Sequence, residues 1–99
     1  MSAKMRRGSP NVFRDLGFGL EEAEHLKIRA DLMVELAKLL KARGFTQARA
    51  AAFLGISQPR VSDLMRGKSE KFSIDTLVAM LGHAGAKVRV VVQPRTRVA

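Results

Sequence analysis

The stretch AAAFLGISQPRVSDLMRG, residues 50–67, constrains the fold more than any other part of the chain. An apolar, alanine-rich segment stops at Gly55, and a polar segment begins almost at once with Ser57 and Pro59. Glycine is typical of a helix end, whereas serine at the N-cap and proline in the first turn are typical of a helix start. Two helices separated by so few residues cannot lie in line, so we predict that they cross.

Small and apolar side chains in this stretch suit such a crossing. Ala51 falls on the inner face of the first helix, where a larger side chain would clash, and Gly55 supplies the backbone freedom for the turn. Ile56, Val61 and Leu64 are expected to anchor the second helix in the core. The remaining polar side chains then point outward: Ser57, Gln58, Arg60, Ser62, Asp63 and Arg66. The pattern predicts a helix-turn-helix, whose second helix enters the major groove of DNA.

Further helices are predicted on both sides of this motif. Residues 21–43 form the clearest helix, with Glu in the first turn, Lys and Arg in the last, and Gly44 as its stop. Its apolar stripe has three- and four-residue steps and comprises Leu26, Ala30, Met33, Leu36, Ala37 and Leu40. Thr46 is expected to cap a helix over residues 47–54, with Ala50, Ala51 and Leu54 facing inward.

The second half of the chain is predicted to add one more helix and a strand. The helix after Ser57 is expected to reach Arg66, and KSEKF, residues 68–72, is a polar loop. Ser73 then caps a helix over residues 74–83, whose buried face is expected to comprise Ile74, Leu77, Val78 and Leu81. Residues 87–94, KVRVVVQP, change to period two, with Val88, Val90 and Val92 on one face of a strand.

Three regions follow from these elements. Residues 1–20 are a basic flexible arm in which residues 11–18 form a short strand or an ordered segment. Residues 21–85 are the helical domain, and residues 86–99 are the terminal strand with a basic tail. A lone strand is not stable in water. The terminal strand must therefore pair with residues 11–18, with its copy in a second chain, or with a partner's sheet.

Composition and charge agree with a small helical domain that binds a polyanion. Of the 99 residues 46% are apolar, but there is no Trp or Tyr, which favours packed helices and a mainly α fold. The formal net charge is +9, and it is unevenly distributed. Residues 21–45 carry five charges of each sign, whereas residues 46–72 carry five positive and two negative charges. A basic motif beside a neutral scaffold indicates a polyanionic partner.

The stretch FTQARAAAFLGISQPRVSDLMRGK, residues 45–68, resembles the lambda-repressor-like (XRE-type) helix-turn-helix family. With the flanking helices in the expected order, the resemblance covers about two thirds of the chain. The Ala–Gly–Val–Leu spacing contributes to it, and the glutamines that begin the two helices, Gln47 and Gln58, strengthen it. The implied fold is a helical bundle with a helix-turn-helix and a short C-terminal strand, with or without an N-terminal one.

The resemblance implies roles for individual residues. Gln47 would bond a phosphate and support Gln58, which would read adenine through its N6 and N7 atoms. Arg60 and Ser62 are candidates for base or phosphate contacts, and Ser57 belongs to the same exposed set. Phosphates would be neutralised by Arg49, Arg66, Lys68 and Lys71. Asp63 departs from this pattern because phosphates would repel it; it accepts a cytosine amino group or, the preferred interpretation, pairs with Arg60 or Arg66.

The flanks suggest a narrower resemblance. NVFRDLGF at residues 11–18, EEAEHLKIRADLM at 21–33 and the terminal KVRVVVQP are similar to segments of small HigA-type antitoxins. Such proteins dimerise, repress their own operon and bind a partner toxin. The expected partners are therefore double-stranded DNA, a second copy of the chain and a toxin protein. A stand-alone regulator without a toxin shares these features, as does an interaction module that neutralises a toxin and binds DNA only secondarily.

Other classes of function have little support in the sequence. There is no cysteine, and neither His25 nor His83 has a second ligand at metal spacing, so we expect no metal, no cofactor and no enzyme activity. RNA binding is disfavoured because no exposed aromatic array is available to stack bases. No apolar run is long enough to span a bilayer, and no signal peptide is evident, so a cytoplasmic, nucleoid-associated protein is expected.

Overall fold

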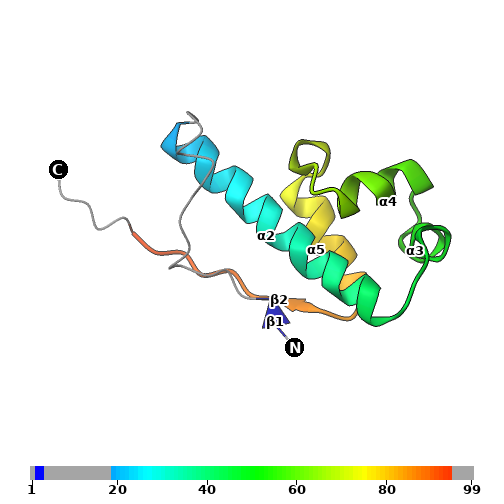
Figure 1. Ribbon diagram of the computed structural model, residues 1–99. Coiled ribbons are helices and arrows are strands. Elements are labelled where there is room, and N and C mark those ends of the chain that lie inside the picture. Colours follow the sequence, from blue (N-terminus) through cyan, green and yellow to red (C-terminus); the bar gives the residue numbers. More distant parts are fainter. Residues whose placement is uncertain (1, 4–18, 95–99) are drawn as a thin grey trace.

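The computed structural model describes residues 2–3 and 19–94, and Figure 1 shows the order of the elements along the chain. Helices form most of the described part, as the sequence predicts. Their bounds are α2 Leu20–Ala42, α3 Gln47–Leu54, α4 Gln58–Met65 and α5 Ile74–His83, with a short 3-10 helix, η1, at Ser69–Lys71. Two short strands, β1 Ser2–Ala3 and β2 Lys87–Val88, complete the described elements. The expected mainly α bundle with a short C-terminal strand is confirmed.

The long helix α2 is the scaffold against which the other elements pack. Its bounds lie one residue from the predicted ones, and its first turn contains Glu21 and Glu22, which favour the positive end of the helix dipole. Figure 1 shows α5 lying along it. The buried residues of α2 are Ala23, Leu26, Leu32, Met33, Leu36 and Leu40, whereas Ala30 and Ala37 of the predicted stripe are only half-buried.

One apolar core joins α2 to the helices that follow it. Its buried members after α2 are Ala50, Ala51, Val61, Leu64, Phe72, Leu77, Met80, Leu81 and Ala84. Leu54, Ile56 and Ile74 pack on this core while half-buried. The prediction that Val78 is buried is wrong, because its side chain is 36% exposed. The apolar residues of α5 recur at three- and four-residue steps on more than one side of the helix. The side that packs against α2 is the one that carries Leu77, Met80 and Leu81.

The sharp turn between α3 and α4 takes the form expected from the sequence. Gly55 follows the last residue of α3 with φ +71° and ψ +33°, in the left-handed region. The carbonyl of Ala51 accepts hydrogen bonds from the backbone N–H groups of both Gly55 and Ile56, the second at 3.0 Å. A Cβ at Gly55 would meet no atom within 4 Å. Glycine is therefore required by the backbone conformation and not by crowding.

The C-terminal strand is much shorter than predicted. The predicted strand covered residues 87–94, but β2 ends at Val88, and Val90 and Val92 are 77% and 88% exposed. A strand continues only where a neighbour accepts and donates its backbone hydrogen bonds. The neighbour here, β1, has two residues; it pairs with β2 in parallel, Ser2 opposite Lys87 and Ala3 opposite Val88. The predicted N-terminal strand at residues 11–18 lies outside the described residues.

The loop after α4 also differs from the prediction. The polar segment 68–72 contains η1 and ends in Phe72, whose side chain is 2% exposed and belongs to the core. Ser69, 6% exposed, is buried as well. An aromatic residue in an otherwise polar segment is the sequence signal for this burial. The free energy gained by removing the phenylalanine side chain from water exceeds the cost of ordering the loop.

Two glycine-to-alanine substitutions are expected to change stability in opposite directions. Gly55→Ala should lower the free energy of unfolding by about 1 kcal/mol, because alanine is strained in the left-handed region. Gly82→Ala should raise it by roughly 0.5 kcal/mol, because Gly82 lies within α5 and alanine is the better helix former. An added Cβ meets no atom within 4 Å at either site. Urea unfolding measures both changes, and equal changes in the two variants would contradict this account of the turn.

Candidate nucleic-acid interface

The amino end of α4 is a polar and exposed part of the helix-turn-helix. Ser57 is its N-cap, and the serine Oγ accepts a hydrogen bond from the backbone N–H of Arg60 at 3.3 Å. Pro59 occupies the first turn, where a missing N–H leaves no helix bond unmade. Ser57 and Gln58 are both exposed. The cap therefore begins the helix at a point where the Gln58 amide faces solvent.

The start of α3 repeats the same local chemistry. Thr46 is the N-cap, and its hydroxyl accepts a hydrogen bond from the backbone N–H of Arg49 at 3.1 Å. Gln47, the first residue of α3, is exposed. The guanidinium of Arg49 lies over the ring of Phe45, with Cζ 5.2 Å from the ring centroid. Both glutamines singled out in the sequence thus lie at exposed, side-chain-capped helix starts.

The rest of α4 divides into a buried and an accessible side. Val61 and Leu64 are 0% and 2% exposed and hold the helix against the core. Ser62 is half-buried, and Arg66, the C-cap residue, is exposed. The prediction that this helix projects its polar side chains outward therefore applies fully to its two ends and only partly to its middle.

Asp63 has a different partner from the expected one. Its Oδ1 lies 3.9 Å from Nζ of Lys68, whereas the sequence interpretation paired it with Arg60 or Arg66. Lys68 follows Gly67, and the backbone N–H of Lys68 also donates to the carbonyl of Asp63 at 3.0 Å. The chain reversal at Gly67 brings this lysine back to α4, and a long, partly exposed ion pair of this kind contributes little to stability. Its effect is to keep a positive charge beside the acidic residue on this helix.

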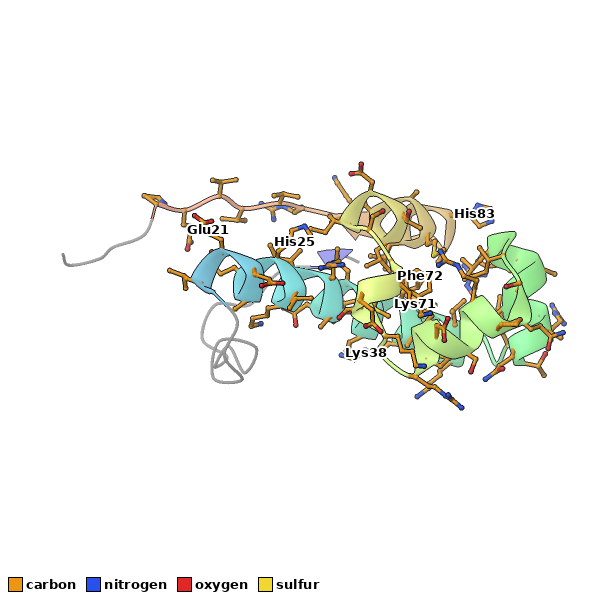
Figure 2. All side chains as sticks on the ribbon, turned by 90° about the horizontal axis from the view of Figure 1, so that it is seen from above. Glu21, His25, Lys38, Lys71, Phe72 and His83 are labelled. Atoms are coloured by element: carbon orange, nitrogen blue, oxygen red, sulfur yellow. The ribbon has the colours of Figure 1, made fainter. Side chains whose placement is uncertain are left out.

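Arg60 has two partners within the chain. Its Nη1–H donates to the carbonyl of Lys71 at 2.8 Å, and its Cζ lies 4.3 Å from the centroid of the Phe72 ring. Figure 2 shows Lys71 and Phe72 beside α4. The side chain of Arg60 is half-buried. The expectation of a base or phosphate contact for this arginine stays a prediction, but in this structure its guanidinium is turned toward the loop.

The predicted site residues fall into two groups by exposure. Five are exposed: Gln47, Arg49, Ser57, Gln58 and Arg66. Three are half-buried: Arg60, Ser62 and Lys68. The structure brings Gln58, Ser62, Arg66 and Lys68 together on α4 and the turn after it, while Gln47 and Arg49 lie on α3, which packs against α4 (Figure 1).

Comparison with known proteins agrees with this geometry. Residues 12–93 match a family described as a helix-turn-helix domain. A solved structure described as an XRE family transcriptional regulator is 36% identical, with a TM-score of 0.70, and the match covers 79% of this chain and 90% of that one. The chain belongs to the XRE-type helix-turn-helix family. Protein P2 of Acyrthosiphon pisum secondary endosymbiont phage 1 is 38% identical over 47 residues, which are 48% of this chain and about half (50%) of that protein.

Membership of the XRE-type family confirms the broader resemblance found in the sequence. The narrower resemblance to HigA-type antitoxins stays a prediction. Among the described residues no helix is long and apolar enough to cross a membrane. No group of three or more His, Asp or Glu side chains that could hold a metal ion is found in the same residues.

Two supporting residues of this XRE-type motif were not identified from the sequence. Phe72 lies under the guanidinium of Arg60, and Arg29 of α2 donates from Nη1 to the carbonyl of Ser69 at 3.1 Å. A signal for Arg29 is present, because it lies three residues after Leu26 and four before Met33, on the apolar stripe of α2. A charged residue at such a position indicates a specific partner, which here is the loop after α4.

Proposed function

We propose that this chain is a sequence-specific DNA-binding transcriptional regulator that reads the major groove with α4. The observation that carries the proposal is the exposed, serine-capped amino end of α4, where Gln58 is free of the core and Gln47 begins the helix packed against it. In helix-turn-helix proteins the amino-terminal residues of the second helix contact base edges. The surplus of positive charge on residues 46–72 suits the phosphates on either side of the groove.

The residues divide into reading and neutralising roles. Gln58 would form two hydrogen bonds with adenine, and Ser62 lies one turn further along the same helix. Ser57 and Gln47, at the two helix starts, would bond phosphate oxygens. Arg49, Arg66 and Lys68 would neutralise phosphates without regard to sequence. This division predicts that the two groups respond differently to mutation.

Gln58→Ala and Arg66→Ala are expected to have distinct effects on DNA binding. Gln58→Ala should lower the preference for the upstream operator over unrelated DNA by about tenfold, since a bidentate base contact is worth about 1–3 kcal/mol. Arg66→Ala should weaken binding to both DNAs alike and reduce the salt slope by about 1. Fluorescence anisotropy over a salt series measures both. Lys87→Ala, an exposed lysine in β2, is the control. Full site preference in Gln58→Ala would contradict the assignment of the reading residue.

We further propose that the regulator acts as a homodimer joined by its C-terminal segments. Residues 89–94 continue from β2 with Val90 and Val92 77% and 88% exposed, although valine-rich segments are typical of a strand. Antiparallel pairing of this segment with its copy about a two-fold axis would give its backbone groups hydrogen-bond partners. A two-fold dimer would place its two α4 helices about 34 Å apart on a palindromic site.

Charge on the exposed valines should prevent this association. Val90→Glu with Val92→Glu is expected to shift the chain from dimer to monomer in sedimentation velocity and to lower operator affinity at fixed protein concentration. Val34→Glu, which changes a valine of α2 that is 52% exposed, is the matched control and should leave the sedimentation coefficient unchanged. An unchanged dimer in the double variant would exclude the terminal segment as the interface.

Neutralisation of a partner toxin is a second proposed function. Figure 1 shows α3 and α4 together at one end of the described residues and the C-terminal segment, residues 89–94, toward the other end. This separation is the observation that favours a second binding surface. The partner protein would bind residues 1–20 or the terminal segment, and binding at residues 89–94 would leave α4 open to DNA. Without such a partner, the chain is a stand-alone regulator.

The product of the adjacent gene is the partner to test. Co-expressed with this chain, it is expected to co-purify in a fixed ratio and to lose its effect on cell growth. Removal of residues 1–20 or of residues 89–99 should abolish retention, according to which of the two segments binds the partner, whereas Gln58→Ala should not change it. An adjacent product that is never retained by the full chain would contradict the antitoxin proposal without affecting the proposal of DNA binding.

A further inference from the structure

The loop that follows the proposed reading helix is held by arginines from two different helices. Arg29 of α2 donates to the carbonyl of Ser69 at 3.1 Å, and Arg60 of α4 donates to the carbonyl of Lys71 at 2.8 Å. Each bond comes from a charged donor, which makes it stronger than a bond between neutral groups. Residues 68–72, which we call the clamp loop, are thus tied to the scaffold and to the reading helix at separate points.

Phe72 fixes the direction of the Arg60 guanidinium. The ring is 2% exposed and belongs to the core, so it cannot move without disturbing the residues around it. Arg60 lies over this ring with Cζ 4.3 Å from the centroid, which is within the range of a cation–π contact. A planar guanidinium that lies over a ring and also donates a hydrogen bond is held in its orientation by both contacts. Lysine at this position would keep the charge and lose that orientation.

The clamp loop carries two lysines beside α4. Lys71 is exposed, and its carbonyl is the group that Arg60 holds. Lys68 is paired with Asp63 of α4 at 3.9 Å. Both ends of the loop are therefore connected to α4 by side chains, at Lys68 through Asp63 and at Lys71 through Arg60. Figure 2 shows the loop between α2 and α4.

We propose that Arg60 is a positioning residue, which orients the clamp loop so that Lys68 and Lys71 meet the phosphates beside the groove read by α4. This inference rests on the proposed DNA-binding function and deepens it. The competing role, direct contact of Arg60 with a base, requires the guanidinium to leave both Phe72 and the Lys71 carbonyl. The two roles predict different effects on DNA binding and on site preference when Arg60 is replaced by lysine.

The first experiment uses free protein and is independent of DNA. Arg60→Lys should raise the amide exchange rates of Lys71 and Phe72, whose N–H groups donate to the carbonyls of Lys68 and Ser69. We expect an increase of about tenfold, with exchange in α2 unchanged. Phe72→Leu, which keeps an apolar side chain but removes the ring, should raise the Lys71 rate in the same way. Arg66→Lys is the matched control and should leave the loop rates as they are. Unchanged loop exchange in Arg60→Lys overturns the proposal.

The second experiment measures DNA binding by the same variants. Arg60→Lys should weaken binding to operator and unrelated DNA by about the same factor, roughly three- to tenfold, and reduce the salt slope by about 1, although the formal charge is unchanged. A change of preference at one base pair would instead make Arg60 a reading residue and overturn the positioning role. If the wild-type chain shows no preference for any upstream DNA, the proposed regulator function fails, while the exchange experiment still decides whether Arg60 holds the loop.

Discussion

The close crossing of α3 over α4 is the constraint on which the exposed interface depends. Ala51 occupies the crossing with 8% exposure, and its carbonyl binds the N–H groups of Gly55 and Ile56, so that the chain reverses within one left-handed residue. The connection between α3 and α4 is therefore too short to cover the start of α4. Val61 then packs with no exposure, which turns the opposite side of the helix to solvent. Presentation of Gln58 is therefore a consequence of how tightly two small helices pack.

Some arginine side chains of this small protein hold segments of the chain together, and others are available to bind phosphates. The chain has no Trp or Tyr and five Phe, and each of the three rings that the structure describes, Phe45, Phe53 and Phe72, lies under a guanidinium group. Arg43 illustrates the structural use, since it lies over Phe53 and donates to the carbonyl of Ala84 at 3.1 Å. A guanidinium can stack and donate at once because it is planar and weakly hydrated. Part of the formal charge of +9 thus holds segments together, and a count of cations overestimates the number available to phosphates.

Local features of the structure agree closely with the sequence predictions. Thr46, Ser57 and Ser73 each accept the capping hydrogen bond expected of them, and the bounds of α3 and α5 are the predicted ones. These features depend on residues within a few positions of one another, which is why sequence patterns identify them. The predictions that failed involve distant residues. Val78 is exposed because α2 selects the other side of α5, and the terminal strand ends at Val88, the last residue that pairs with β1 among the described residues.

By itself, the sequence determined where helices begin and end, which residues form the crossing, and that Gln47 and Gln58 start two adjacent helices of an XRE-type motif. These follow from caps, glycine stops and apolar spacing, all of which act over a few residues. Only the tertiary structure decided which positively charged side chains bond to other groups of the same chain. Arg60 and Lys71 are eleven residues apart, and Arg29 and Ser69 are forty, so no local pattern joins them. Their contacts exist because packing of α2, α4 and Phe72 around one core brings the loop within reach of both arginines.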